Sequence, residues 1–298
     1  MSNLPTVSII IPVYNAASTI AICLDSIQRL NYPKNAFEVI VVDNGSNDGS
    51  DRIARNYDIK LLYETTIQSS YQARNAGIAK ANGNLIAFTD SDCVVAADWL
   101  SNLVKYWDDH TIGCFAGEIL SYEPNTMVEK FSDHYGILSQ PGVLNHPYMP
   151  YTATANCAYR REVFDIIGLF NPYLYSGGDA DISWRMQKET EFNIKFIPEA
   201  KIYHKHRVDI IGLYKQCKRY EYGQLLLHKV YPDLKLATIE ERRAEVLRAT
   251  YSVLRWLPGS ILKFTTGKID RLTLFYNFFI FITCLGTYRG RLSKLDDQ

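Results

Sequence analysis

The sequence lacks the cysteine pattern of a disulfide-bonded or zinc-binding protein. It contains no Cys-x-x-Cys pair, and its six cysteines are scattered, several of them within apolar stretches: Cys23, Cys93, Cys114, Cys157, Cys217 and Cys284. Such spacing is typical of reduced, buried thiols, so we expect a cytosolic protein. The first residues also lack a basic segment and run directly into a predicted strand, so we expect no signal peptide.

The net charge of the whole chain is zero, but its two parts carry opposite charges. The protein carries 32 basic and 32 acidic side chains, yet residues 1–199 have 14 basic and 23 acidic ones, and residues 200–298 have 18 and 9. The acidic part suits a metal-dependent site. The basic part predicts contact with an anionic surface such as lipid headgroups, or electrostatic attraction between the two parts of the molecule.

A clear membrane span is also not evident. Arg271 and Arg289 bracket 17 uncharged residues, which is the lower limit for a spanning helix, and Asn277 lies among them. Because apolar residues occupy nearly every helical face of this run, it has to be buried. Three interpretations stay open: packing on the domain or a partner, insertion into one membrane leaflet, or a true span.

Strand and helix signals alternate through the first hundred residues. Apolar, β-branched runs predict strands, and helical apolar spacing predicts helices between them; the strands are 7–11, 37–42, 59–63 and 85–89, and the helices 18–30, 48–54 and 70–81. This order predicts an α/β fold with a mostly parallel, Rossmann-like sheet flanked by helices.

The signals are weaker further along the chain. We expect helices at 98–107, 161–167 and 179–188, and strands at 113–119, 152–159 and 193–197. Residues 121–150 show no clean periodicity, which favours a mobile substrate-binding region. From residue 209 onward we expect a helical C-terminal extension, broken at Pro232 and at Pro258-Gly259.

Asp90-Ser91-Asp92 directly follows the predicted strand at 85–89. Two carboxylates with one residue between them can bind a hard divalent cation that also holds a diphosphate. Open α/β folds place their ligands at the carboxyl edge of the sheet, where this triplet is expected. The triplet alone is a weak signal, because Asp-x-Asp occurs by chance in many loops.

Three further motifs accompany the triplet. They all precede it in the chain, in the order Val7-Ser8-Ile9-Ile10-Ile11-Pro12-Val13-Tyr14-Asn15, then Val41-Val42-Asp43-Asn44-Gly45-Ser46-Asn47-Asp48-Gly49-Ser50, then Ala73-Arg74-Asn75-Ala76-Gly77. Together the four blocks resemble the family 2 glycosyltransferases, which have the GT-A fold, over roughly residues 5–210. The resemblance implies transfer of a sugar from a nucleotide sugar with inversion at the anomeric carbon.

The resemblance also implies which residues bind the donor. Asp43 would accept the N–H of a nucleobase, most often uracil; an Asx-turn before Gly45 is a second interpretation, and both can hold. Arg74 would contact phosphate or base, or form a surface salt bridge. The expected donor-binding residues are Pro12, Val13, Tyr14, Asp43, Arg74, Asp90 and Ser91.

In the GT-A pattern the last aspartate of the triplet binds the metal, and the first contacts ribose or metal-bound water. The expected metal residues are therefore Asp92, Asp90 and a late histidine, His204 ahead of His206. Oxygen ligands and a diphosphate favour Mg²⁺ or Mn²⁺. The cation would neutralise charge that develops on the departing diphosphate.

Ser176-Gly177-Gly178-Asp179-Ala180-Asp181 resembles the acceptor-side motif of the family, usually Gly-Glu-Asp-x-Asp, with Gly178 in place of Glu. Inversion in one step needs a base for the acceptor hydroxyl, and we assign Asp179, which could also be only an N-cap. Asp181 has Arg185 one turn on, which indicates a structural pair. Gly178 and Asn156 complete the expected acceptor site, although Asn156 could simply satisfy backbone groups.

The sequence thus predicts a metal-dependent, inverting hexosyltransferase that moves a sugar, UDP-linked by preference, to a glycan or lipid-linked acceptor, as in polysaccharide biosynthesis. We expect a catalytic domain at 1–208, with a donor half at 1–95 and an acceptor half at 96–208. Residues 209–298 form the helical extension, with peripheral contact through 251–291 at the cytoplasmic face of a membrane. No nucleic-acid partner is expected.

Two other functions remain alternatives. A sugar-nucleotide pyrophosphorylase would carry a Gly-rich N-terminal loop with a basic residue, which Pro12-Val13-Tyr14-Asn15 lacks. A catalytically silent nucleotide-sugar-binding protein would lack Asp92 or Asp179, and both residues are present.

Overall fold

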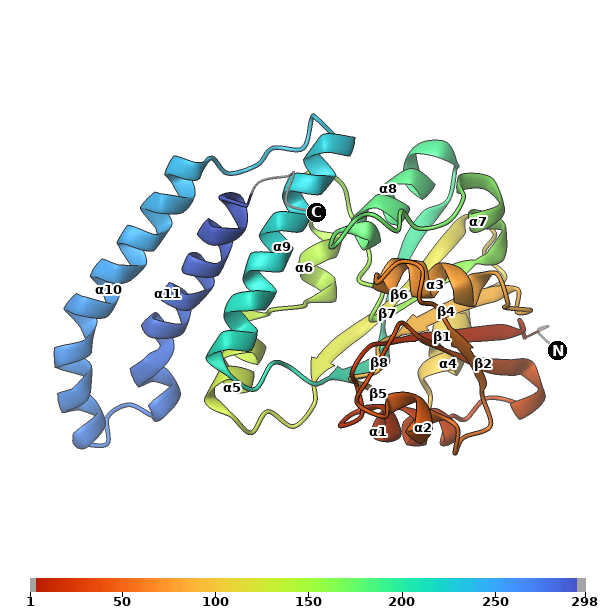
Figure 1. The fold of residues 1–298 in the computed structure, drawn as a ribbon, viewed down its shortest axis with the longest axis horizontal. Helices are drawn as coiled ribbons and strands as arrows, with labels where there is room; N and C mark the ends of the chain where they lie inside the picture. Colours follow the sequence, from red (N-terminus) through yellow and green to blue (C-terminus); the bar gives the residue numbers. More distant parts are fainter. Residues whose placement is uncertain (1–3, 294–298) are drawn as a thin grey trace. The chain divides into compact units, whose positions relative to one another are not determined.

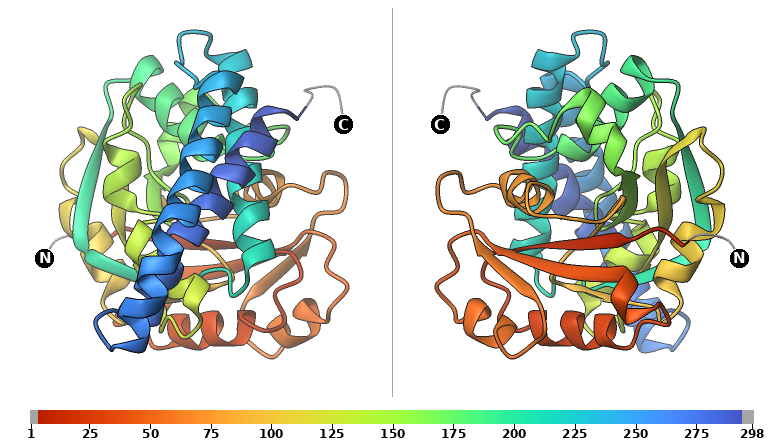
Figure 2. Two further views of the ribbon diagram at one scale, coloured as in Figure 1. Left: turned by 90° about the vertical axis from the view of Figure 1, so that its left-hand side faces the viewer. Right: turned by 90° about the vertical axis from the view of Figure 1, so that its right-hand side faces the viewer.

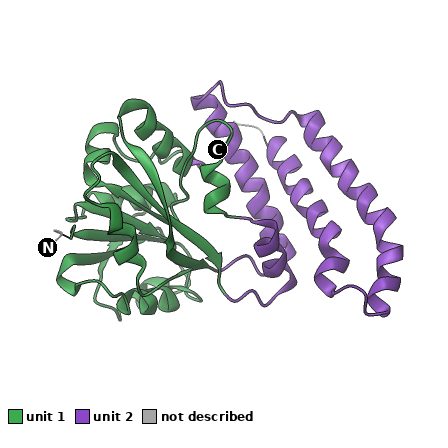
Figure 3. Ribbon diagram, turned by 180° about the vertical axis from the view of Figure 1, so that it is seen from behind, with its two compact units in different colours: residues 1–122, 138–173, 178–204 green, residues 123–137, 174–177, 205–298 purple. Residues whose placement is uncertain are grey.

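The computed structural model describes residues 4–293. The chain forms two compact units (Figure 3): unit 1 comprises residues 1–122, 138–173 and 178–204, and unit 2 comprises residues 123–137, 174–177 and 205–298. The second unit therefore begins near the predicted boundary at 208 but also includes two short segments from the middle of the chain. In one of them, Gly177 lies against Leu227, and its missing side chain permits that approach.

Unit 1 contains one eight-stranded sheet with the order β3-β2-β1-β4-β7-β6-β8-β5 (Figure 1). The strands are β1 (Val7–Val13), β2 (Phe37–Asp43), β3 (Lys60–Tyr63), β4 (Leu85–Thr89), β5 (Cys93–Val95), β6 (Ile112–Ser121), β7 (Asn156–Arg160) and β8 (Asn193–His204). Strands β1 to β4 are mutually parallel, whereas β7 runs antiparallel to β4 and β6, and β5 runs antiparallel to β8. The predicted fold class, a mostly parallel sheet flanked by helices with a helical C-terminal region, is confirmed.

Helices cover both faces of this sheet. They are α1 (Ile20–Gln28), α2 (Ser50–Ala54), α3 (Ser70–Ile78), α4 (Trp99–Leu103), α6 (Gln140–Leu144), α7 (Arg161–Ile167) and α8 (Gly178–Glu189), with short 3₁₀ helices η1 (Lys34–Ala36) and η2 (Val104–Tyr106). Figure 2 shows α3 on one side of the sheet and α1 and α2 on the other.

The central strands are buried on both faces, as expected for parallel strands between helix layers. Ile9 and Ile11 join one core cluster with Leu24 and Trp99. Ile10 points to the opposite face, toward α3. A side chain at Gly77 would place its Cβ 2.5 Å from Ile10 Cγ2, so this glycine lets α3 lie close against β1.

Unit 2 is helical: α5 (Met127–Tyr135), α9 (Ile210–Val230), α10 (Ile239–Thr265) and α11 (Arg271–Arg291). The uncharged run at 272–288 lies in α11, whose Phe279 and Ile282 pack with Phe131 of α5 and Leu213 of α9. Packing on the protein is therefore the interpretation that the structure favours for this run. Among residues 4–293, no helix combines the length and hydrophobicity needed to cross a membrane.

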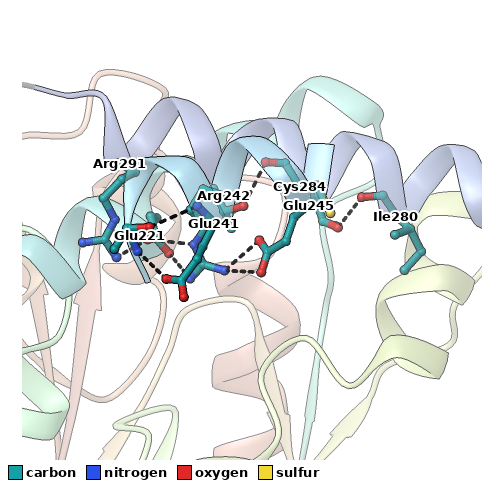
Figure 4. A network of polar contacts seen from close by, with 10 residues as sticks. Glu221, Glu241, Arg242, Glu245, Ile280, Cys284 and Arg291 are labelled. Carbon is teal, nitrogen blue, oxygen red and sulfur yellow. Dashed lines mark hydrogen bonds and ion pairs between the residues drawn. The ribbon is translucent and has the colours of Figure 1, made fainter. Parts of the chain in front are cut away.

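A buried ion-pair network joins three helices of unit 2 (Figure 4). Glu221 of α9 is 3% exposed and pairs with Arg242 of α10 at 2.8 Å and with Arg291 of α11. Arg242 also pairs with Glu245 at 2.9 Å. Two arginines and two glutamates thus balance each other between the helices.

Several sequence predictions were wrong in detail. Helix α10 continues through Pro258. Proline has no N–H, so the carbonyl of Leu254 loses its helical hydrogen bond. Both residues are exposed, and water can therefore replace the lost bond. The predicted break at Pro232 is confirmed, since α9 ends at Val230. Strand β8 extends past Pro198 to His204, and β5 was not predicted.

The segment at 121–150 is also more ordered than predicted. It contains α5 and α6. Helix α5 begins with a capping box, in which the Thr126 hydroxyl accepts from the Glu129 backbone and the Glu129 carboxylate accepts from the Thr126 backbone. Both helices are short, which explains why their periodicity is weak in the sequence.

Candidate functional site

The predicted donor residues lie together at the carboxyl edge of the sheet in unit 1. In the β1–β2 register, Val13 stands opposite Asp43, and Asp90 follows the last residue of the neighbouring β4. The loops after β1 and β2 are joined, because the Asn15 side chain accepts from Asn47 N at 2.9 Å. The parallel topology therefore produces the clustering that the sequence predicted.

Asp43 is 2% exposed, and its two oxygens differ in their surroundings. Oδ1 accepts from the backbone N–H groups of Gly45 at 3.0 Å and Ser46 at 2.9 Å, which is the expected Asx-turn. Oδ2 is buried and has no hydrogen-bond partner among the described residues. The turn and a free acceptor for a ligand N–H therefore coexist on one carboxylate. Tyr14, which follows β1, is 52% exposed.

Arg74 on α3 is not part of a surface salt bridge. Its side chain is buried, and Nη2 pairs with Asp90 Oδ1 at 2.6 Å. Burial alone would lower the pKa of Arg74, but the charges of Asp90 and Asp179 outweigh it and raise the pKa. Burial raises the pKa of Asp90, Arg74 opposes the rise, and the charge of Asp92 adds to it. The site therefore contains more negative charge than Arg74 neutralises.

Asp92 faces His204 at the end of β8, with 3.6 Å between Oδ1 and Nε2. The pairing of β5 with β8 sets Cys93 opposite His204 and so brings these two side chains together. Within residues 4–293, no group of three or more His, Cys, Asp or Glu side chains is arranged to hold a metal ion. The residues nevertheless fit a hard cation in chemistry: carboxylates with excess negative charge, beside one imidazole. His206 belongs to unit 2, and its role stays a prediction.

Asp179 lies in the first turn of α8 and is held from two sides. Its carboxylate accepts from Thr154 N at 3.2 Å and from the Thr154 hydroxyl at 3.1 Å. The hydroxyl of Tyr71 on α3 is also close enough to this carboxylate for the two groups to interact. Burial raises the pKa of Tyr71 well above its usual value, and the charge of Asp179 contributes, so the hydroxyl stays protonated and can donate.

Sequence reasoning missed Tyr71. The side chain is 6% exposed, and its ring stacks on Phe170 at a centroid distance of 5.7 Å. The sequence held one usable signal: Tyr71 stands three residues before Arg74 on the same helix, which places both on one face. The guanidinium carbon of Arg74 lies 5.7 Å from the Tyr71 ring centroid.

Gly178 and Tyr71 are sterically linked. A Cβ at Gly178 would lie 2.8 Å from three ring atoms of Tyr71, so no side chain fits there while the tyrosine is in place. The Gly178 backbone also lies near the Tyr71 hydroxyl and lowers the pKa of Tyr71, against the larger rise caused by burial. The departure from the family motif at 178 thus comes with a tyrosine ring in the space that a larger residue would need.

Two other residues have structural roles. Asn156 is fully buried; its Oδ1 accepts from Trp99 Nε1 at 2.7 Å, and its Nδ2 donates to the carbonyls of Glu118 and Ala200 at 2.7 and 2.8 Å. The alternative in which Asn156 satisfies neighbouring groups is therefore the one that the structure favours over sugar contact. Asp181 pairs with Arg185 at 3.0 Å, as its spacing predicted.

Known proteins resemble the chain in sequence and in fold. Residues 8–174, more than half of the chain, match the family described as Glycosyl transferase family 2. The "Glycosyltransferase AglE" of Haloferax volcanii is 36% identical over 185 residues, which cover 60% of each protein. The matched regions span 60% and 43% of the first two curated relatives, less than two thirds of their lengths.

Two solved structures share the fold. "Mannosyltransferase PcManGT from Pyrobaculum calidifontis in complex with GDP-Man and Mn2+" aligns with a TM-score of 0.66 and 18% identity, over 96% of this chain and 88% of that one. The S. aureus protein TarS 1-349, in complex with UDP-GlcNAc, aligns with a TM-score of 0.51 and 18% identity, over 95% and 90%. These likenesses concern the fold, whereas the sequence match places the chain in a family: it belongs to glycosyl transferase family 2.

Proposed function

We propose that the protein transfers a sugar from a nucleotide-diphosphate sugar to a hydroxyl group, with inversion at the anomeric carbon. One observation carries the proposal: a buried carboxylate with a free acceptor oxygen, an acidic cluster and a hydrogen-bonded aspartate all lie in unit 1 along with the family motifs. The names of the Haloferax volcanii relative and of the Pyrobaculum calidifontis structure agree with this class of reaction, and the TarS structure contains a nucleotide sugar, UDP-GlcNAc.

Asp43 Oδ2 would bind the base of the donor. Uracil and guanine both present an N–H to a carboxylate, and a UDP-sugar is our preferred donor. Pro12, Val13 and Tyr14 border the nucleotide, and Ser91 lies between the two aspartates. Arg74 forms an ion pair with Asp90, and its guanidinium would face the phosphates of the donor.

Asp92 would hold a divalent cation, Mg²⁺ or Mn²⁺, with Asp90 and His204 beside it. When bound, such a cation neutralises charge on the departing diphosphate. The similar mannosyltransferase structure contains Mn²⁺, which supports the assignment. In this chain, the carboxylates around Arg74 outnumber its single positive charge, and this excess of negative charge favours the binding of a cation.

Asp179 would act as the general base. Its carboxylate takes the proton of the acceptor hydroxyl while that oxygen bonds to the anomeric carbon and the bond from that carbon to the diphosphate oxygen breaks. Thr154 donates to the carboxylate, and the protonated Tyr71 hydroxyl beside it would be a second donor that helps to fix its direction. Tyr71 is thus a positioning residue, because it acts through Asp179.

The acceptor we propose is the hydroxyl of a glycan or of a lipid-linked sugar, as in polysaccharide biosynthesis. Contact of residues 251–291 with the cytoplasmic face of a membrane would bring the enzyme to such an acceptor. The excess of 18 basic over 9 acidic side chains in residues 200–298 supports this placement.

A thermal-shift screen of UDP-, GDP-, dTDP- and ADP-sugars, with and without Mn²⁺, tests the function. We expect one class of nucleotide sugar to raise the melting temperature, more so with Mn²⁺. Asp43→Asn should remove that shift, because the amide keeps the turn but points a donor at the base N–H, whereas the exposed Asp58→Asn should retain it.

The same screen can contradict the proposal. No shift with any nucleotide sugar would refute donor binding. Formation of a nucleoside triphosphate from the bound donor and pyrophosphate would indicate the pyrophosphorylase instead, and donor binding without transfer to any glycan or lipid-linked acceptor would favour the silent binding protein.

A further inference from the structure

Helix α10 exposes a row of apolar side chains along its length. Leu247, Tyr251, Leu254, Pro258 and Ile261 follow one another at intervals of four, three, four and three residues, so they lie on one face of the helix. Together with the adjacent Leu262 we call them the α10 stripe. Their exposed fractions are large for apolar residues: Leu247 61%, Tyr251 61%, Leu254 69%, Ile261 50% and Leu262 68%.

The stripe is not the face by which α10 packs. Ala249 and Ser260 are the buried residues of this helix, and at about 100° per residue they lie roughly opposite the stripe. Helix α10 therefore has apolar residues both where it packs in unit 2 and where it meets solvent. A continuous exposed apolar row of this kind marks an interaction surface.

Only positive charge accompanies the stripe. Residues 246–269 contain no aspartate or glutamate, but they contain four exposed basic residues: Arg248, Arg255, Lys263 and Lys268. The acidic residues on either side are already engaged, since Glu245 pairs with Arg242 and Asp270 caps α11 by accepting from Thr273 N at 2.8 Å. Within residues 246–269 the surface is thus apolar and cationic, and the exposed Glu240 lies about two turns before Leu247.

An open cleft of about 480 Å³ within unit 2 shares Tyr251 with the stripe and extends from there toward the packing face of α10. Arg255 and Lys263 line it, together with Trp256, Ser252 and Asn277. Cationic and hydroxyl donors beside an indole suit a phosphate-bearing headgroup, because they offer charge and hydrogen bonds next to an apolar wall.

We propose that the α10 stripe lies on the surface of an anionic lipid bilayer, with its apolar side chains among the headgroups and acyl chains and its basic residues against lipid phosphates. This inference rests on the membrane contact proposed above and locates it. The contact surface is the exposed face of α10, and not the more hydrophobic run at 272–288, which α11 uses for packing inside unit 2.

Charge decides between a bilayer and a second copy of the chain. A symmetric dimer through residues 246–269 would bring the basic residues of both copies together, and that range contributes no acid to separate them. An anionic bilayer provides the missing countercharge. Each basic residue near such a surface strengthens binding by about fivefold.

Vesicle flotation of the full chain tests the proposal, with phosphatidylcholine vesicles alone or containing phosphatidylglycerol. The wild type should float with the anionic vesicles, and less at high salt. Leu254→Glu/Ile261→Glu should lower the apparent affinity by at least about tenfold. The matched control, Ile211→Glu/Val230→Glu, adds the same charge at exposed positions of α9 (65% and 47%) and should float like the wild type. Arg248→Gln/Arg255→Gln, at the two basic residues that flank the stripe, should lose about 25-fold.

The outcomes are separable. If Leu254→Glu/Ile261→Glu floats like the wild type, the stripe is not the contact, although the membrane contact stands. If the wild type floats with neither vesicle, the inference and the membrane contact both fail, while the nucleotide-sugar thermal shift still reports on the transferase proposal. A lipid-free dimer that Leu254→Glu/Ile261→Glu makes monomeric in sedimentation would show a contact between copies and overturn the inference.

Discussion

One cluster of charged side chains in each unit shows a different balance of acids and bases. In unit 2, Glu221 and Glu245 meet Arg242 and Arg291, so acids and bases are equal in number and each group has a partner (Figure 4). In unit 1, the charges of Asp90 and Asp179 raise the pKa of Arg74, and the charge of a third carboxylate, that of Asp92, raises the pKa of Asp90. The first cluster is complete without a ligand, whereas the second has an excess of negative charge that a ligand would have to neutralise.

The largest effect should come from Asp179→Asn. Loss of the proposed base should lower the rate of transfer by about 10²- to 10⁴-fold, while the nucleotide sugar still binds. Turnover and donor binding by calorimetry are the two measurements. Asp181→Asn tests the neighbouring acid, whose partner is Arg185. Loss of donor binding in Asp179→Asn would instead make Asp179 a structural residue.

Asp92→Ala tests whether the excess charge binds a cation. It should lower Mn²⁺-dependent transfer by about 10²- to 10³-fold and abolish the Mn²⁺-dependent part of donor binding in calorimetry. Asp98→Ala, at an exposed acid nearby that makes no capping bond, should leave both unchanged. Wild-type binding and turnover in Asp92→Ala would contradict the metal assignment.

Glu221→Gln tests the balanced cluster. Two arginines would remain without their shared carboxylate, so the free energy of unfolding should fall by about 3 kcal/mol. The midpoint of urea denaturation, followed by circular dichroism, measures the change. Glu240→Gln, at an exposed position of α10, is the control and should keep the wild-type midpoint. An unchanged midpoint in Glu221→Gln would mean that the network adds no stability.

A smaller effect is expected for Tyr71→Phe, which keeps the ring over Gly178 but removes the donor that we propose for Asp179. We expect kcat to fall by about tenfold, because one hydrogen bond to a charged group is lost, and KM for the donor to stay constant. Tyr57→Phe removes a comparable bond, from Tyr57 to Asp25 at 2.9 Å, and serves as control. A change in KM alone would assign Tyr71 to donor binding.

The smallest effect concerns alkaline stability. Because burial raises the pKa of Tyr71 above 10.0, its protonated form favours the folded state; this contribution is complete below pH 10 and is lost as pH rises further. The free energy of unfolding should therefore decrease above pH 10 in the wild type, and less steeply in Tyr71→Phe. The exposed Tyr14→Phe should follow the wild-type curve; equal slopes in all three proteins would argue against the shift.

Local patterns predicted the sheet well and the C-terminal region less well. Strands β1, β2 and β4 are buried, apolar and bounded by turn residues, so periodicity and the family motifs both located them. The surroundings of the run at 272–288 were undetermined, since hydrophobicity requires burial but does not say against what. Its partners, Phe131 and Leu213, are distant in sequence and become visible only in the folded unit.

The site shows the same division. Asp43, Asp90, Asp92 and Asp179 stand next to strand or helix ends and were predicted from motifs. Tyr71 was missed because its partners, Gly178 and Asp179, lie more than a hundred residues away, and a tyrosine is usually a packing residue. For Asn156, the choice between the alternatives depended on Trp99, Glu118 and Ala200, three positions that no local pattern connects.

The interlocking of Gly178 with the ring of Tyr71 also constrains the order in which these positions can change. A larger residue at position 178 fits only if a small residue has replaced Tyr71. A small residue at position 71, in turn, leaves a void beside Asp179 until a larger residue at position 178 fills it. A library that varies one position at a time would find no larger residue tolerated at 178 and no small one at 71, so paired replacement is the route by which an engineer could change both.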